Sequence, residues 1–204
     1  MKMKSFVFAL MAATLLFVAC DVIPENDRLT EVELTPSDRT VLLVEFTGNR
    51  CVNCPGAAMV AHDMLEVIPE NVVVVGMHPA GIVYTNPMDP TIDLSSADAM
   101  EYLKFYGGSQ STGLPVGVVN GRQFDGTYLQ GSSKWTAQVF AQREIAPKCL
   151  IGLNHTVEGA NHTVVATLKP QVEIESASLL FWLVESNIVG PQSIDATLVD
   201  SYKK

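Results

Sequence analysis

A strand, a helix and a second strand are predicted in direct succession, and this pattern limits the fold more than any other feature of the chain. Residues 41–47 (V-L-L-V-E-F-T) and 72–78 (V-V-V-V-G-M-H) are apolar and rich in β-branched residues without strict alternation, which is typical of strands covered on both faces. Between them, apolar residues recur at three- and four-residue spacing, as on the packed face of a helix: Ala57, Ala61, Met64, Leu65 and Ile68. This order implies a right-handed parallel crossover, so we expect an α/β core.

The core is predicted to extend over residues 36–147. Residues 79–93 contain three prolines and show no periodicity, which indicates a long surface loop of the kind that is often functional. Helices are expected at residues 95–106 and 131–146, the second presenting Trp135, Val139, Phe140 and Ile145. Asn120-Gly121 is a strong signal for a two-residue turn and predicts a hairpin after Pro115.

The character of the chain changes after this domain. Residues 149–157, 162–168 and 179–188 are strand-like and are separated by turn residues. We therefore expect a small antiparallel β region over residues 148–204. Three strands make a thin sheet, whose edges are either covered by the α/β domain or left exposed.

Composition and charge exclude some classes of protein. With 48% hydrophobic and 17% charged residues, the chain can bury enough apolar surface to fold as a globular protein. Thirteen Lys and Arg against twenty-two Asp and Glu give a net charge of -9. No segment combines basic and aromatic residues as a nucleic-acid surface requires, so we expect no nucleic-acid partner.

The N-terminal segment has the pattern of a processed signal. Lys2 and Lys4 precede an apolar stretch over residues 6–17, which is too short to span a membrane, because a spanning helix needs about 20 residues. Val18, Ala19 and Cys20 follow directly, and this arrangement resembles a lipobox. The alternative is an ordinary secretory signal, or a short buried helix, with a chance cysteine.

The lipobox resemblance implies an anchored protein. Residues 1–19 would be a signal peptide that is cut away, and acylation of Cys20 would attach the chain to a lipid bilayer without a transmembrane helix. Residues 20–35 are polar, contain Pro24 and are expected to form a tether.

The candidate chemistry lies at Cys51-Val52-Asn53-Cys54. This pair follows a predicted buried strand and begins a predicted helix, whose unpaired N-H groups and positive dipole end favour a thiolate at Cys51. Arg50 adds a nearby positive charge. Cys51 is therefore the predicted nucleophile, and Cys54, one turn later, the thiol that resolves a mixed disulfide.

Two other interpretations of a C-x-x-C pair remain. In an exported protein it is also compatible with a closed structural disulfide. A zinc site needs a second pair of ligands, but Cys149 is single and the four histidines show no paired spacing: His62, His78, His155 and His162. We expect no metal site and no cofactor, and we expect Cys149 to be a buried structural cysteine rather than an intermolecular one.

Gly113-Leu114-Pro115 opens a predicted strand and resembles the cis-proline loop of thioredoxin-like proteins. With it, V-L-L-V-E-F-T, C-V-N-C and V-V-V-V-G-M-H occur in the order of that fold over residues 40–147. The resemblance implies an α/β thioredoxin-like domain in which Pro115 faces the dithiol and shapes a groove for other thiol or disulfide proteins. The departures are Arg50, where the family usually has an aromatic residue, and the Val-Asn pair between the cysteines.

A narrower resemblance spans nearly the whole chain. The lipobox, G-N-R-C-V-N-C-P-G-A-A and W-L-V-E-S-N-I-V-G-P-Q look like the twenty-eight-kilodalton outer-membrane lipoprotein family of Bacteroides-type bacteria. This implies a location in the cell outer membrane, facing the periplasm or the cell surface. Family members continue with further strands after G-P-Q, so we expect the β region here to be truncated or divergent.

Two functional hypotheses follow. The first is a membrane-tethered protein for thiol-disulfide exchange that uses Cys51, Cys54 and Pro115, and the residues leave open whether it is an oxidoreductase. The second is a non-catalytic structural or binding lipoprotein of the outer membrane, in which a Cys51/Cys54 disulfide staples the turn between strand and helix.

Overall fold

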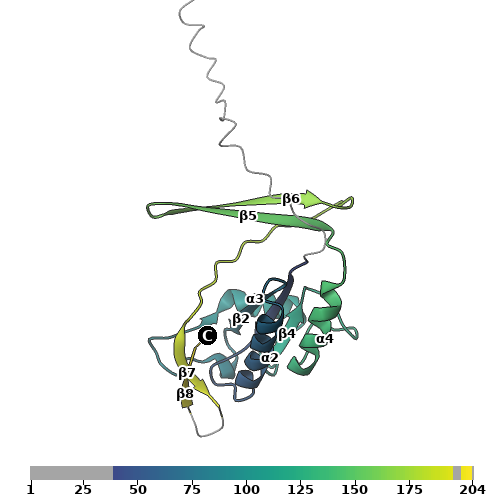
Figure 1. Cartoon of the computed structure of the whole chain (residues 1–204). Coiled ribbons are helices and arrows are strands. Elements are labelled where there is room, and N and C mark those ends of the chain that lie inside the picture. The colour runs from purple at the N-terminus through teal and green to yellow at the C-terminus, as the bar shows by residue number, and fades with distance from the viewer. Residues whose placement is uncertain (1–38, 195–198, 204) are drawn as a thin grey trace, which may run out of the picture. The chain divides into compact units, whose positions relative to one another are not determined.

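The computed structural model describes residues 39–194 and 199–203, so the predicted signal peptide, Cys20 and the tether lie outside the described residues. The fold is mixed α/β, with one four-stranded sheet and separate antiparallel hairpins (Figure 1). In chain order, its elements are β1 Val41–Phe46, α2 Cys54–Val67, β2 Val72–Pro79, η3 Val83–Thr85, β3 Ser95–Ser96, α3 Ala97–Phe105, β4 Val116–Val119, α4 Ser132–Arg143, β5 Cys149–Glu158, β6 Asn161–Pro170, β7 Val189–Ser193 and β8 Val199–Lys203.

Strand β1 is central in the sheet, whose order is β3-β2-β1-β4. It pairs in parallel with β2, from Val41 opposite Val72 to Phe46 opposite Met77. On its other edge β1 pairs with β4 in antiparallel orientation. The parallel β1-α2-β2 unit predicted from the sequence is therefore confirmed, and β4 makes the sheet mixed.

The two faces of the sheet are covered by different helices. Val41 and Leu43 of β1 belong to an apolar cluster with residues of α2 and α4, whose buried members include Ala57, Ala61, Met64, Trp135 and Val139. Val44 and Phe46 belong to a second cluster, which includes both cysteines and residues of α3. Because neighbouring residues of a strand point to opposite faces, the apolar residues of β1, interrupted only by Glu45, supply both layers.

The helices form close to where their sequence signals place them. Helix α3 begins after Ser96, whose side chain accepts a hydrogen bond from the backbone N-H of Ala99 at 3.3 Å, as an N-cap does. Ile145, expected on the buried face of the last helix, lies beyond the end of α4 and is exposed.

The turn predicted at Asn120-Gly121 forms, but the hairpin does not. Both residues have positive φ, 53° and 61°, and the N-H of Arg122 donates to the carbonyl of Val119 at 3.0 Å. Residues 122–130 form no strand, and a single bridge between Gly117 and Gln130 joins them to β4. Phe124 and Thr127 exchange backbone hydrogen bonds in a second isolated bridge, and the Gln130 side chain donates to the carbonyls of both residues. Isolated bridges and side-chain hydrogen bonds therefore hold residues 122–130 in place of a continuous ladder.

The β region differs from the prediction in its third strand. Strands β5 and β6 pair as expected over ten residues each. Residues 179–188 form no strand, and β7 and β8 instead make a second pair further along the chain. Strand propensity depends on pairing with a neighbour, and most large apolar side chains of the 179–188 segment are exposed rather than packed on a partner strand. The expected three-stranded sheet is therefore wrong.

A close approach between Gly117 and the buried Trp135 gives a test of the core. A Cβ atom at position 117 would lie 2.6 Å from Cε2 and Nε1 of the indole. We expect Gly117→Ala to lower the free energy of unfolding by about 1 to 3 kcal/mol, because a well-packed core does not accept an extra methyl group. Urea unfolding of the oxidised protein measures this.

The matched control is Gly56→Ala in α2, where an added Cβ meets no atom within 4 Å. We expect that substitution to raise the free energy of unfolding by up to about 1 kcal/mol, since alanine is the better helix former. Equal urea midpoints for the two variants would contradict the packing argument.

Candidate functional site

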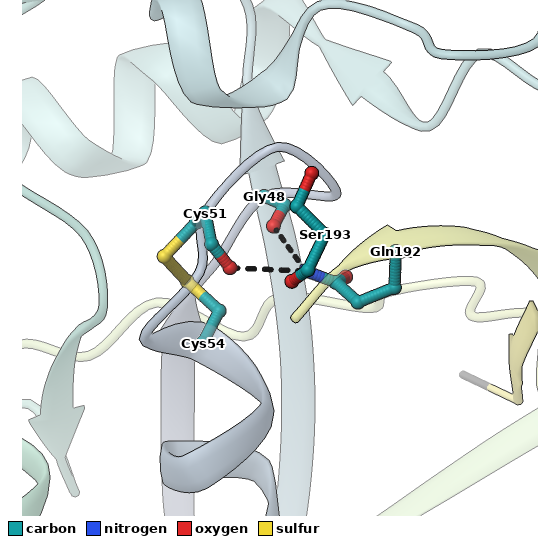
Figure 2. The surroundings of a disulfide bond; sticks show 5 residues. All are labelled: Gly48, Cys51, Cys54, Gln192 and Ser193. Carbon is teal, nitrogen blue, oxygen red and sulfur yellow. Dashed lines mark hydrogen bonds between the residues drawn. A yellow bond between two sulfur atoms is a disulfide. The ribbon is translucent and has the colours of Figure 1, made fainter. Parts of the chain in front are cut away.

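Cys51 and Cys54 form a disulfide in the turn between β1 and α2, with their Cα atoms 5.4 Å apart (Figure 2). The N-H of Cys51 donates to the carbonyl of Gly48 at 3.1 Å, and the N-H of Cys54 to the carbonyl of Cys51 at 3.3 Å. Cys54 is the first residue of α2. The structure thus places the pair at a strand end and a helix start, as the sequence predicted.

Both cysteines are buried. Cys51 is 3% exposed and Cys54 2%, and both belong to the cluster that also contains Phe46, Ile82 and Leu103. The two residues between the cysteines, Val52 and Asn53, are exposed. A partner approaching the turn therefore meets the loop between the cysteines before it meets the disulfide.

The predicted proline loop lies next to this cluster. The Leu114-Pro115 peptide bond is cis, and Leu114 is a buried member of the cluster that contains both cysteines. Leu114-Pro115 directly precedes β4, the antiparallel neighbour of β1. The structure therefore brings together the segments of Cys51, Cys54 and Pro115, which are the three residues selected from the sequence within the described part of the chain.

Arg50 fastens the turn to the loop over residues 79–93. Its guanidinium donates to the carbonyls of Asn86 at 3.0 Å and Pro87 at 2.9 Å. Its backbone N-H donates to the carbonyl of Tyr84 at 2.8 Å. The positive charge expected beside Cys51 is thus committed to loop carbonyls, and the loop is joined to the turn rather than standing free of it.

Gln192 of β7 is a site residue that the sequence analysis missed. Its side-chain N-H groups donate to the carbonyls of Gly48 at 3.2 Å and Cys51 at 3.0 Å, and the N-H of Ser193 donates to the carbonyl of Asn49 at 2.8 Å. Gln192 is 2% exposed. Figure 2 shows the disulfide projecting from one side of the turn and Gln192 approaching from the other. Strand β7 therefore supports the backbone of the turn.

A second contact attaches the segment before β7 to α3. The indole Nε1-H of Trp182 donates to the hydroxyl of Tyr102 at 2.8 Å, and the two rings meet edge to face at 5.1 Å. Tyr106 lies in the same apolar cluster, where burial, followed by the neighbouring Tyr102 and Tyr128, raises the pKa of its phenol. Both contacts come from the segment W-L-V-E-S-N-I-V-G-P-Q, which begins at Trp182 and ends at Gln192 and has no spacing that predicts a contact with α3 or with the cysteine turn.

Two buried polar residues and one free cysteine lie outside the contacts described so far. Glu45 of β1 and His78 of β2 are buried, and no sequence pattern had selected Glu45. Cys149 is a free thiol that is only partly buried, and its Sγ contacts the carbonyl of Leu150 at 3.4 Å.

In the described ranges, no group of three or more His, Cys, Asp or Glu side chains could hold a metal ion. Within those same ranges, no helix has the length and hydropathy to cross a membrane.

Comparisons with known proteins assign no family to this chain. No protein-family profile and no curated protein matches the sequence. One solved structure that is similar to this chain is a crystal structure of an Agrobacterium tumefaciens protein from a structural genomics programme, with 18% sequence identity and a TM-score of 0.42. The similarity covers 57% of this chain and 51% of the other, so this chain spans about half the length of its solved neighbour.

The contacts of Gln192 lead to a stability prediction. We expect Gln192→Ala to lower the free energy of unfolding by about 1 to 3 kcal/mol, because it removes a buried donor from two carbonyl groups of the turn. Thermal or urea unfolding of the oxidised protein measures the change.

Gln171→Ala is the matched control. Gln171 also donates from its side chain to a backbone carbonyl, that of Lys169 at 3.0 Å, but it is exposed. We expect its substitution to change the free energy of unfolding by less than about 0.5 kcal/mol. If both glutamine variants are equally stable, the support from β7 is energetically unimportant.

Proposed function

We propose that this chain is a membrane-tethered lipoprotein whose thioredoxin-like domain exchanges disulfides with other proteins through Cys51 and Cys54. One observation carries the proposal: the disulfide closes where β1 ends and α2 begins, in the same buried cluster as Leu114, the residue before Pro115. At the N-terminus of a helix, unpaired N-H groups and the positive end of the helix dipole stabilise the thiolate form of a cysteine relative to its thiol form.

The exchange would proceed in two balanced steps. A thiolate of a reduced partner attacks the Sγ atom of Cys51, forms a mixed disulfide and releases Cys54 as the thiolate. A second thiolate of the partner then attacks the partner's own sulfur in the mixed disulfide, which leaves the partner oxidised and Cys51 reduced. Two electrons pass to the cysteine pair. In the reverse direction, Cys51 is the nucleophile and Cys54 resolves the mixed disulfide.

A second candidate function is supported by a different observation. Both cysteines are almost fully buried, and Gln192 and Arg50 hold the backbone around them. Such a pair suits a structural disulfide, which staples the turn in a non-catalytic binding or structural lipoprotein. For exchange to occur from this state, the turn has to open far enough for a thiolate to reach a sulfur atom in line with the bond.

The membrane location rests on the N-terminal sequence. Cys20 directly follows Val18-Ala19 and an apolar segment, and each methylene of an attached acyl chain that enters the bilayer contributes about 0.8 kcal/mol. The proposed anchor is the outer membrane, on its periplasmic or surface side, in line with the resemblance to outer-membrane lipoproteins.

Redox chemistry distinguishes the two candidates. The measurement is the reduction potential of the Cys51/Cys54 pair, made on a chain that starts at residue 21 and carries Cys149→Ser. A potential above about -230 mV, with a Cys51 pKa below about 7.5, supports exchange. A potential below about -300 mV, with an inert thiol, supports the structural disulfide.

Trapping gives an independent readout. In the same background, Cys54→Ser leaves Cys51 free, and we expect it to accumulate a mixed disulfide with an oxidised model protein at pH 7. Cys51→Ser is the matched control and should trap little, because Cys54 is the resolving thiol. Equal trapping by the two variants would contradict the assigned roles.

Anchoring has its own test. We expect Cys20→Ser to abolish incorporation of radiolabelled palmitate and to shift the protein from the membrane fraction to the soluble fraction of a Bacteroides-type host. Cys149→Ser is the matched control and should keep both label and membrane association. A Cys20→Ser protein that remains labelled would show that Cys20 is not the acylated residue.

A further inference from the structure

Two histidines meet on the β5-β6 hairpin, away from the cysteine pair. The antiparallel register places His155 opposite Val164 and His162 opposite Val157. Side chains two residues apart on a strand point to the same face, so His155 and His162 are diagonal neighbours on one face of the hairpin. The seven-residue separation of these histidines in the sequence does not by itself indicate that they are neighbours. The register of the hairpin brings them together.

The geometry of the pair is specific. His155 Nε2 and His162 Nδ1 lie 3.0 Å apart, and the two rings are nearly parallel, with an interplanar angle of 16° and centroids 5.1 Å apart. One nitrogen therefore donates a hydrogen bond to the other, so the two nitrogens face each other across this bond. Both residues are exposed, which leaves room for water or a small ligand beside them.

The nitrogen spacing indicates which coordination geometry fits. Imidazole nitrogens bind a divalent ion such as zinc at about 2.1 Å. Two nitrogens that kept this 3.0 Å spacing would subtend about 90° at the ion, whereas a tetrahedral angle would require them to move apart to about 3.4 Å. A right angle between neighbouring ligands is the arrangement of square-planar and tetragonal sites, which copper(II) and nickel(II) prefer.

We propose that His155 and His162 form a two-imidazole binding site for copper(II), with water at the remaining positions. Copper(II) is the tightest binder among the divalent first-row ions at a site with nitrogen ligands. On binding, the ion replaces the hydrogen bond between the rings. The imidazole that donated this bond moves its proton through solvent to its other nitrogen, so both rings stay neutral and each offers one lone pair.

The hairpin is a suitable scaffold for such a pair. Ten consecutive residues of β5 pair with ten of β6, and Gly159, with φ of 63°, occupies the turn next to Glu158 and Asn161. The ladder fixes the separation of the two backbones, and the rings have to rotate away from their mutual hydrogen bond to direct both lone pairs at an ion. A site on a regular strand pair is held more precisely than one on a loop.

The test is a titration of the full chain, carrying Cys20→Ser and Cys149→Ser so that neither cysteine outside the disulfide offers a thiol, with copper(II) sulfate at pH 7.5. Calorimetry should give a stoichiometry of one ion for the hairpin site. Electron paramagnetic resonance should show a tetragonal copper(II) spectrum with hyperfine structure from two nitrogens. We expect His155→Ala and His162→Ala each to weaken binding by about ten- to hundredfold and to remove the two-nitrogen pattern.

Two variants serve as controls. Thr163→Ala alters the opposite face of the same hairpin, and His62→Ala removes an exposed histidine of α2 that pairs with Glu66 at 3.4 Å. Both should bind copper(II) as the parent chain does. The proposal is overturned if the parent shows no two-nitrogen spectrum, or if the two hairpin variants bind copper(II) as tightly as the parent while circular dichroism shows them folded.

Discussion

The structure depends on the double pairing of β1. This strand is hydrogen-bonded along both edges, to β2 and to β4, and its side chains are packed on both faces. Buried N-H and C=O groups must be paired, and only a strand with two neighbours satisfies all of them away from water. Because β1 ends at Phe46, the turn with Arg50 and the two cysteines follows at the carboxyl end of this strand. The site is a consequence of where β1 ends.

Around the cysteines, two physical effects oppose each other. The start of α2 favours a thiolate by about 0.3 to 1 kcal/mol, or up to ~2 kcal/mol in favourable buried geometry. Burial of an acidic group in apolar surroundings disfavours its charged form by up to 3 to 5 pKa units, and each unit corresponds to about 1.4 kcal/mol. In the closed turn the two sulfur atoms are bonded to each other and neither titrates, so both effects act on a thiolate only once the disulfide is broken. The exchange proposed above would therefore need a form of the turn in which the helix terminus still acts and water reaches the sulfur.

Local signals predicted local structure well and distant contacts poorly. The β1-α2-β2 unit and helices α3 and α4 were found because periodicity and capping depend on residues close in the chain. Residues 179–188 have strand-like composition, yet Trp182 instead packs on Tyr102 of α3, a partner 80 residues away. Gln192 donates hydrogen bonds to the backbone carbonyls of Gly48 and Cys51. Every residue has such a carbonyl, so the residue types at positions 48 and 51 do not indicate that Gln192 binds there. His155 and His162, in contrast, followed from the hairpin register and were overlooked.

The support that Gln192 gives to the turn also imposes an order in time. A polypeptide is made from its N-terminus, and Gln192 follows Cys51 by 141 residues. Until residue 192 has been made and β7 has docked, the carbonyls of Gly48 and Cys51 lack their hydrogen bonds from Gln192. The surroundings of the cysteine pair are therefore completed by one of the last segments of the described chain.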